Sequence, residues 1–413
     1  MNFKLTTRKQ LPIGLDIGSN SIKMIQLAVS GGQIRVIAAK KVHIECDLSA
    51  DSESRREYLV SMLKKMVSEG GFQGSEVVSC LANDALKITS LRLAEDQSGA
   101  IEESLRQEVS QRFGLDSTED SVRYMVAGDV RQGDETKNEL IVFAASGDSI
   151  REHISFLEEA GLRPVGIDAL PCALFRSFER SLQREEDKDR TAVFVDLGCK
   201  YTTVVFGRGR EITFVKQIPI GGSSFDEEIA SKLGVSVSEA GMLRGRLRME
   251  NSGTIGVERA SESGGGEDVG DSGAVNGEGE VALDSSTRRV MVDAINGIAE
   301  QLVREISLCF RYYTVTFRGK RVECAYLSGG EAYEQILVNA LHRQLAVKIE
   351  MSQPLRGFAM VQVDFGSDRR GCLTEWAVAT GLSLKDCKDG DMVRMDASAE
   401  EVIFDRAGSY ERN

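Results

Sequence analysis

Two segments far apart in the chain each place an aspartate just before a glycine-containing turn. In residues 12–29 (PIGLDIGSNSIKMIQLAV), Asp16 ends an apolar, β-prone run, and the turn 18–21 precedes a second apolar run. This pattern predicts strand, tight turn and strand. Because Gly18 has no Cβ and the next three side chains are short donors, the turn could hold a phosphate. Asp16 beside a phosphate would require a cation such as Mg²⁺ between them. A polar hairpin with an exposed aspartate is the alternative for this segment alone.

Residues 192–206 (AVFVDLGCKYTTVVF) repeat this design in the second half of the chain. An apolar strand ends at Asp196, Gly198 follows in a short polar turn, and a returning strand begins at Thr202. Two Asp-hydrophobe-Gly hairpins in one chain predict two halves of similar structure. Each half would present a carboxylate beside a turn able to hold phosphate.

A third segment, residues 325–336 (AYLSGGEAYEQI), places Gly329 and Gly330 between an expected strand and an expected helix. Glycines there permit close approach of a flat ring or a sugar to the backbone. In their order and separation, the three segments resemble the phosphate-1, phosphate-2 and adenosine motifs of the ATPase superfamily that contains actin, Hsp70 and the sugar kinases. The resemblance implies an α/β, two-lobed actin-like ATPase fold built from duplicated RNase-H-like domains.

Composition excludes several classes of function. A chain of 413 residues can form two lobes with substantial cores. A net charge of −13 argues against nucleic-acid binding, which depends on Lys and Arg to neutralise phosphates. The eight cysteines include no CxxC pair, which favours reduced thiols in a cytosolic protein over disulfides or a zinc site. The three histidines lie far apart in the chain, which argues against a histidine metal site. Since no apolar run reaches the roughly 18 residues of a membrane span, we expect membrane association only through a partner.

An inserted α+β subdomain is expected at residues 76–165, with the order strand, strand, helix, strand, strand, helix. Such a module suits protein docking better than catalysis. The arrangement resembles the bacterial type IV pilus assembly proteins of the PilM family, relatives of the cell-division protein FtsA, which carry this subdomain between the first two phosphate motifs. The resemblance extends to about Leu384 and is carried by residues 15–27, 101–145, 157–178, 218–236, 304–313, 327–333 and 376–384.

The resemblance and the composition together predict eight segments in chain order. They are the N-terminal part of the first lobe (11–75), the inserted FtsA/PilM-like subdomain (76–165), the interlobe connection with a first-lobe helix (166–190), the N-terminal part of the second lobe (191–249), a flexible Gly/Ser/acidic insertion (250–287), the adenosine-motif part of the second lobe (288–370), a C-terminal return helix (371–385) and a polar tail (386–413). The insertion is expected to be disordered because its few apolar residues cannot offset the entropy of ordering.

The resemblance implies that ATP and Mg²⁺ bind between the lobes. The residues expected to hold phosphates are Gly18, Ser19, Asn20 and Lys23 from one lobe and Gly198, Thr202, Gly221 and Gly222 from the other; Gly329 and Gly330 would lie against the adenosine, and Asp16 and Asp196 would orient the hydrated Mg²⁺. No catalytic residue is assigned. Relatives commonly have a glutamate where this chain has Leu170, which favours weak or absent hydrolysis. Asp168 could substitute for it or could cap the following helix.

We therefore expect a cytoplasmic ATP-binding component of the inner-membrane assembly platform of a type IV pilus or related secretion system. The nucleotide would act as a conformational clamp, because it would favour the closed arrangement of the lobes. In the resembled family, the partner is the short cytoplasmic segment of the inner-membrane protein PilN. A PilN-like partner, bound in a groove by the inserted subdomain, would hold the protein peripherally at the membrane. Self-association is left open.

Two alternatives stay within the same superfamily. A small-molecule kinase would need a carboxylate base in its cleft, for which the sequence offers no convincing candidate. An FtsA-like cell-division protein would usually end in an amphipathic membrane helix. Residues 396–413 (DASAEEVIFDRAGSYERN) are short and acidic instead, which disfavours binding to an anionic membrane surface.

Overall fold

The computed structural model divides into two compact units. Unit 1 contains residues 1–189, 209–213 and 352–413, and unit 2 contains residues 190–208 and 214–351. The structure describes residues 9–44, 52–94, 101–115, 119–132, 135–179, 190–258, 283–317, 321–360, 363, 365, 372–385 and 387. The expected polar tail, residues 386–413, therefore lies outside the described residues except for Cys387.

Unit 1 is built on a six-stranded sheet in the order β14-β3-β2-β1-β4-β8. Its strands are β1 (Lys9–Ile17), β2 (Ser21–Ser30), β3 (Gln33–His43), β4 (Glu76–Cys80), β8 (Arg163–Asp168) and β14 (Ala359–Met360). The first three strands form an antiparallel meander, and β4 and β8 continue the sheet in parallel. The central residues of β1 and β2, Leu11–Asp16 and Ile22–Val29, are all buried because helices cover both faces of the sheet.

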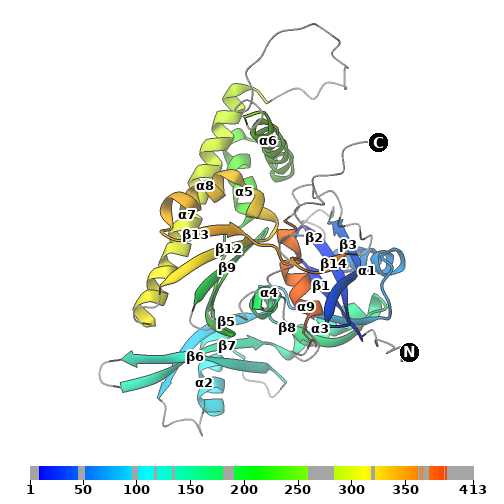
Figure 1. Cartoon of the computed structure of the whole chain (residues 1–413), viewed down its shortest axis with the longest axis vertical. Helices are drawn as coiled ribbons and strands as arrows, with labels where there is room; N and C mark the ends of the chain where they lie inside the picture. Colours follow the sequence, from blue (N-terminus) through cyan, green and yellow to red (C-terminus); the bar gives the residue numbers. More distant parts are fainter. Residues whose placement is uncertain are drawn as a thin grey trace, which may run out of the picture. The chain divides into compact units, whose positions relative to one another are not determined.

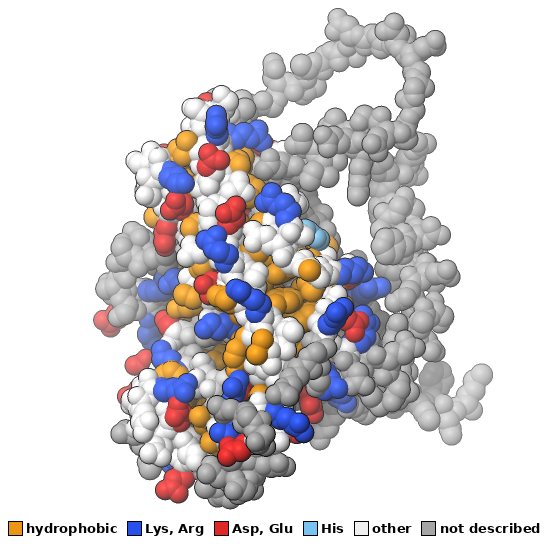
Figure 2. Space-filling view, turned by 90° about the vertical axis from the view of Figure 1, so that its left-hand side faces the viewer, with side chains coloured by type: hydrophobic (Ala, Val, Ile, Leu, Met, Phe, Trp, Pro, Cys, Tyr) orange, Lys and Arg blue, Asp and Glu red, His pale blue; other side chains and the backbone are white. Residues whose placement is uncertain are grey.

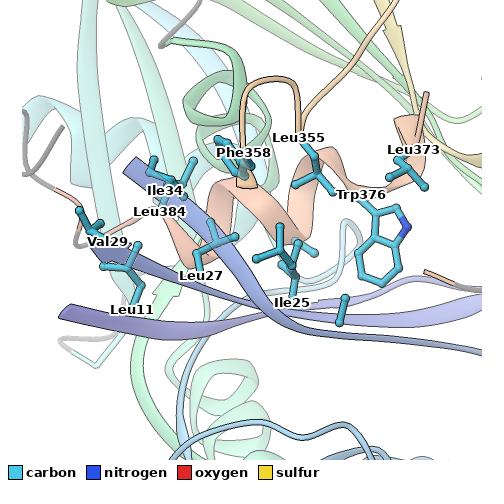
Figure 3. Close-up of a cluster of buried hydrophobic side chains, with 13 residues drawn as sticks. Leu11, Ile25, Leu27, Val29, Ile34, Leu355, Phe358, Leu373, Trp376 and Leu384 are labelled. Carbon is cyan, nitrogen blue, oxygen red and sulfur yellow. The ribbon is translucent and has the colours of Figure 1, made fainter. Parts of the chain in front are cut away.

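One face of this sheet packs on α1 (Ser52–Glu69) and α3 (Gly147–Glu159), where Leu15 and Met24 meet Leu63 and Leu157. The opposite face packs on α4 (Leu170–Glu179) and α9 (Ala377–Ser383). Trp376 lies directly before α9 and is fully buried in the cluster drawn in Figure 3. Helix α9, near the C-terminal end of the described residues, packs on β1 and β2 (Figure 1).

A separate three-stranded antiparallel sheet has the order β5-β7-β6. It consists of β5 (Lys87–Ala94), β6 (Ser121–Gln132) and β7 (Glu135–Ala145), with α2 (Ile101–Phe113) packed on one face. The expected subdomain, residues 76–165, also includes β4 and the start of β8, but these strands pair within the larger sheet. β4 belongs there because its apolar side chains are buried between β1 and β8.

Unit 2 contains a five-stranded sheet in the order β11-β10-β9-β12-β13. Its strands are β9 (Thr191–Leu197), β10 (Thr202–Arg208), β11 (Glu211–Ile218), β12 (Val322–Ser328) and β13 (Lys348–Met351). In this sheet β9 forms an antiparallel hairpin with β10 and pairs on its other edge with the parallel strand β12, which pairs in parallel with β13. In unit 1, β1 is joined in the same way to β2, β4 and β8. The repeated strand order shows that the two halves share one architecture.

Five helical segments accompany this sheet: α5 (Gly222–Leu233), α6 (Val237–Glu258), α7 (Ser285–Thr316), η4 (Gly330–Tyr333) and α8 (Gln335–Gln344). Helix α7 packs against α5 and α8 (Figure 1). It covers β10 through Phe206, whose ring stacks on Tyr313 at 4.7 Å between centroids. Both ends of the expected insertion, residues 250–287, are helical, since α6 runs to Glu258 and α7 begins at Ser285; residues 259–282 lie outside the described residues.

The outer side of α7 retains exposed apolar side chains. Leu308, Tyr312 and Val315 follow one another at intervals of four and three residues, so they share one side of the helix. Figure 2 shows one face of the molecule on which hydrophobic side chains reach the surface between Lys and Arg side chains. Within the described part of the chain, no helix is both long enough and apolar enough to span a bilayer.

Candidate functional site

The first candidate element is the turn between β1 and β2 in unit 1. The Gly18 N–H donates to the Ser21 carbonyl at 3.0 Å, and the Ile44 N–H donates to the Asn20 carbonyl at 3.0 Å. A Cβ at Gly18 would lie 3.1 Å from the same Ser21 oxygen, so the tight turn favours glycine. Ser19 is half-buried and Asn20 is exposed at the tip of the turn. The backbone thus forms the small, accessible turn that the sequence predicts.

Asp16 and Lys23 are directly opposite each other in the β1–β2 register. Lys23 Nζ lies 2.9 Å from Asp16 Oδ2, and the two side chains are only 10% and 12% exposed. At this burial, each charge needs the other, because an unpaired ion would be poorly solvated. The two residues assigned separately to phosphate and metal binding are therefore one ion pair at the base of the turn.

The β9–β10 turn in unit 2 has the same backbone design. The Gly198 N–H donates to the Tyr201 carbonyl at 3.1 Å, which matches the Gly18–Ser21 bond in both spacing and length. Asp196, at the end of β9, is half-buried and lies opposite Ser328 of β12 in the parallel register. The predicted repeat of an aspartate and a closed glycine turn is therefore present in both units.

Thr202 does not fit its expected role of holding phosphate. Its side chain is fully buried, and its hydroxyl donates to the Ile220 carbonyl at 2.8 Å. Direct contact with a ligand is therefore excluded in this conformation. Thr202 instead holds the segment that leads into α5, a role that sequence spacing alone does not distinguish from ligand binding.

Gly221 and Gly222 pack closely against the β9–β10 turn. The Gly222 N–H donates to the Gly198 carbonyl at 3.0 Å, and the Ser223 N–H donates to the Cys199 carbonyl at 2.7 Å. A Cβ at Gly221 would lie 2.5 Å from that Cys199 oxygen. The first amides of α5 are thus engaged by the turn itself, so these two glycines serve close backbone packing rather than offering open donors to phosphate.

Gly329 and Gly330 differ from each other in their surroundings. Gly329 is buried with φ = 89°, and a Cβ there would lie 2.3 Å from the Leu197 carbonyl oxygen. Only glycine fits this position, because both the conformation and the space exclude a side chain. Gly330 is exposed, and nothing lies within 4 Å of its ideal Cβ position. Gly330 is therefore the member of the pair that a ligand could approach.

A buried charge cluster beside these glycines was missed by the sequence reasoning. Arg244 and Arg248, one turn apart on α6, bind Glu331 of η4, and Arg244 also binds Asp226 of α5. Burial opposes ionisation of Glu331, but the two guanidinium groups outweigh burial and lower its pKa to about 2. Burial raises the pKa of Asp226, although Arg244 opposes that shift. The i, i+4 spacing of the two arginines was the available signal, but it did not identify their partners.

Asp168 is engaged at the start of α4. Its carboxylate accepts hydrogen bonds from the Ala169 N–H at 2.9 Å and from Arg176 at 2.8 Å, and Lys385 Nζ lies 3.7 Å away. The carboxylate thus binds α4 through Arg176, whereas its backbone bond goes to the adjacent Ala169 and not to the N–H two or three residues on that a helix cap would bind. A carboxylate held by two cations is poorly placed to take a proton from water.

The candidate residues fall into two groups at strand ends. In unit 1, Asp16, Gly18, Ser19, Asn20 and Lys23 share one hairpin; in unit 2, Asp196, Gly198, Gly221, Gly222, Gly329 and Gly330 meet where β9 and β12 end. Among the described residues, no three His, Cys, Asp or Glu side chains are grouped to hold a metal ion. Single carboxylates beside a phosphate site still fit Mg²⁺, which keeps most of its waters and is commonly carried by the phosphates.

Residues 14–252 match the family described as type IV pilus assembly protein PilM. The solved "PilM-PilN type IV pilus biogenesis complex" includes a chain that is 20% identical, with 90% of this chain and 97% of that chain covered and a TM-score of 0.65. This likeness confirms the expected two-lobed actin-like fold. Ethanolamine utilization protein EutJ from Carboxydothermus hydrogenoformans is 11% identical, with 93% and 91% covered and a TM-score of 0.47. The cytoplasmic domain of EpsL, an inner-membrane component of the Vibrio cholerae type II secretion system, is 16% identical, with 52% and 71% covered and a TM-score of 0.31.

Proposed function

This chain belongs to the type IV pilus assembly protein PilM family, and from that premise we propose that it is a cytoplasmic, ATP-binding component of a pilus or related secretion assembly platform at the inner membrane. The observation that carries ATP binding is the repeated hairpin. In each unit an aspartate is the last residue but one of a strand. The glycine two residues later closes the turn onto the carbonyl three residues further on, at 3.0 and 3.1 Å. Such turns suit the phosphates of a nucleotide.

In unit 1, Ser19 and Asn20 would approach the phosphates at the tip of the turn. Lys23 would add a positive charge, and Asp16 would hold Mg²⁺ through water. Because Lys23 and Asp16 are paired at 2.9 Å, Mg²⁺ at Asp16 would free the lysine to meet a phosphate, so both charges remain compensated.

In unit 2, Asp196 would be the second carboxylate toward Mg²⁺, and exposed Gly330 would lie against the nucleoside. The glycine at 198 and the buried glycines at 221, 222 and 329 would shape the site by close backbone packing. Hydrolysis would be weak or absent, because Asp168, the candidate substitute for the missing glutamate, is bound by Arg176 at 2.8 Å.

We further propose that the partner is the short cytoplasmic segment of a PilN-like inner-membrane protein, since the similar solved chain is in a PilM-PilN complex. The β5-β7-β6 sheet supports this proposal. Its edge strand β6 exposes Tyr124 and Val126, with exposed fractions of 41% and 51%, so an extended segment could find both backbone and apolar contacts there. Membrane association would then come through the partner.

The nucleotide would act as a clamp through differential affinity for two arrangements of the units. By linkage, ATP would then change the affinity for the PilN-like segment, and the segment would change the affinity for ATP by the same factor. A peptide of that segment, titrated with and without Mg²⁺-ATP, tests the clamp separately from binding itself.

Isothermal titration with ATP and Mg²⁺ tests the nucleotide site. We expect Asp16→Asn and Asp196→Asn each to weaken binding about tenfold or more, a loss of about 1.4 kcal/mol. Asp293→Ala, at an exposed position on α7, is the control and should bind as the wild type does. Thermal melting of each variant separates loss of the site from loss of the fold.

Wild-type protein that binds no ATP, or full affinity in both aspartate variants, would rule out this nucleotide site. Peptide capture tests the pilus assignment independently. If an immobilised PilN-like peptide retains no more protein than a scrambled peptide does, the proposed partner is ruled out.

A further inference from the structure

Arg244 joins three segments of unit 2 from a buried position, with 5% of the residue exposed. Its guanidinium donates to both carboxylate oxygens of Asp226 on α5, at 2.6 and 3.1 Å, and to both oxygens of Glu331 on η4, at 2.8 and 3.4 Å. It also donates to the Gly222 carbonyl at 3.1 Å and lies over the Phe225 ring, 5.4 Å from the centroid. One side chain of α6 therefore binds both the start of α5 and the start of η4.

Two partners of Arg244, Glu331 and the Gly222 carbonyl, lie at the glycines of the candidate site. Glu331 directly follows Gly330, and its Oε1 fills the space where a Cβ of Gly222 would stand, only 2.3 Å from that position. Gly222 donates its N–H to Gly198 in the β9–β10 turn. The guanidinium thus fixes the distance between two glycine segments that are separated by more than a hundred residues in the chain.

The charges of this cluster indicate that it fixes the relative positions of α5, α6 and η4 and adds little net stability. Asp226, Glu331 and Glu334 face Arg244 and Arg248, which leaves the group with a net charge of −1. Burying so many ions costs desolvation energy that their attraction does little more than offset. The planar guanidinium, however, imposes direction on each carboxylate that it binds, which a single point charge cannot do.

We propose that Arg244 is a positioning residue for nucleotide binding: it holds the Gly329-Gly330 turn against the start of α5, in the geometry that receives the nucleoside. The inference rests on the proposed ATP binding and deepens it. Arg244 need not touch the nucleotide in this role, because its partner Glu331 directly follows Gly330, against which the nucleoside would lie. Removing Arg244 also leaves Asp226 and Glu331 with one cation fewer, so we expect its loss to lower stability as well as ATP affinity, and both are measured.

The test compares Arg244→Met with Arg244→Lys and with Arg92→Met. Arg92 is the matched control because it also binds a buried glutamate, Glu139, at 2.6 Å, but in the β5-β7-β6 sheet. Each variant is measured by titration with Mg²⁺-ATP, by thermal melting, and by hydrogen–deuterium exchange of peptides covering residues 218–226.

We expect Arg244→Met to weaken ATP binding about tenfold or more and to speed exchange at Gly222 and Ser223. Arg244→Lys should fall between it and the wild type, because lysine retains the charge without the fork. Arg92→Met should lower the melting temperature, with ATP affinity within about twofold of wild type. Should Arg244→Met fail to fold, the lysine variant carries the comparison.

ATP affinity in Arg244→Met equal to wild type would overturn the inference and leave the proposed function intact. The inference would also be overturned if Arg92→Met lost as much ATP affinity as the Arg244 variants for the same loss of melting temperature. The loss of affinity would then follow from the loss of stability alone. Wild-type protein that binds no ATP would refute the proposed function and the inference together.

Discussion

Replacing Gly381 with alanine tests how tightly the C-terminal helix α9 is packed in unit 1. A Cβ at this position would lie 1.7 Å from the Ala173 carbonyl oxygen of α4, whereas real Cβ atoms essentially never come within 3.0 Å of such a neighbour. Because both atoms belong to helix backbones, no side chain can rotate away. The two helices must separate by more than about 1 Å, in a core packed as densely as a crystal.

The expected loss of stability follows from this displacement. Overpacking a core costs about 1–3 kcal/mol. Moving α9 also strains two hydrogen bonds: Arg176 donates to the Gly381 carbonyl at 2.9 Å, and the Ser383 hydroxyl donates to the Pro12 carbonyl at 2.7 Å. Each is worth about 1 kcal/mol. The free energy of unfolding of unit 1 should therefore fall by roughly 3–5 kcal/mol.

Trp376 supplies the assay because it is the only tryptophan of the chain, is fully buried and lies directly before α9. Its ring meets Phe365 edge-on, with 5.3 Å between centroids. Fluorescence during denaturation in guanidinium chloride therefore reports on the docking of α9. We expect the midpoint of this transition to move to a clearly lower denaturant concentration in Gly381→Ala.

Gly297→Ala is the matched control. Gly297 lies within α7 of unit 2, and nothing lies within 4 Å of its ideal Cβ position, so alanine should stabilise that helix by about 0.5–1 kcal/mol. The Trp376 transition should not move in this control. An unchanged Trp376 midpoint in Gly381→Ala would refute the close crossing of α9 and α4.

Three further perturbations probe other groups. Burial lowers the pKa of His153, whose Nε2 lies 2.7 Å from the Ser79 hydroxyl, to about 4. Below pH 6.5 the unfolded state therefore binds more protons, and denaturation at different pH values should show a loss of about 3 kcal/mol in the free energy of unfolding toward pH 4. His153→Leu should not show this loss. Lys23→Met leaves Asp16 buried without its cation and should cost about 3 kcal/mol by chemical denaturation, whereas adding Asp16→Asn should restore most of it. Asp284→Ala should lower the melting temperature by removing the α7 cap, with Asp284→Asn near wild type.

The elements that the sequence predicts well depend on neighbouring residues. Both hairpins follow from apolar runs interrupted by a glycine turn, and the structure closes them with equivalent bonds at Gly18 and Gly198. The side chains that surround these turns are less predictable. In the sequence Thr202 resembles a ligand-binding hydroxyl. In the structure its hydroxyl is buried and bonded to the Ile220 carbonyl, because the segment that leads into α5 packs against it.

The sequence by itself therefore determined the two similar halves, the glycine turns with their aspartates and the family resemblance, since alternation, turn residues and their order are local properties of the chain. Tertiary structure alone decided that β4 and β8 join the larger sheet and that Gly329 serves packing while Gly330 faces outward. It also decided that Arg244 binds Glu331, 87 residues away in the chain. Such contacts depend on which segments fold against one another, and no periodicity within either segment records that choice.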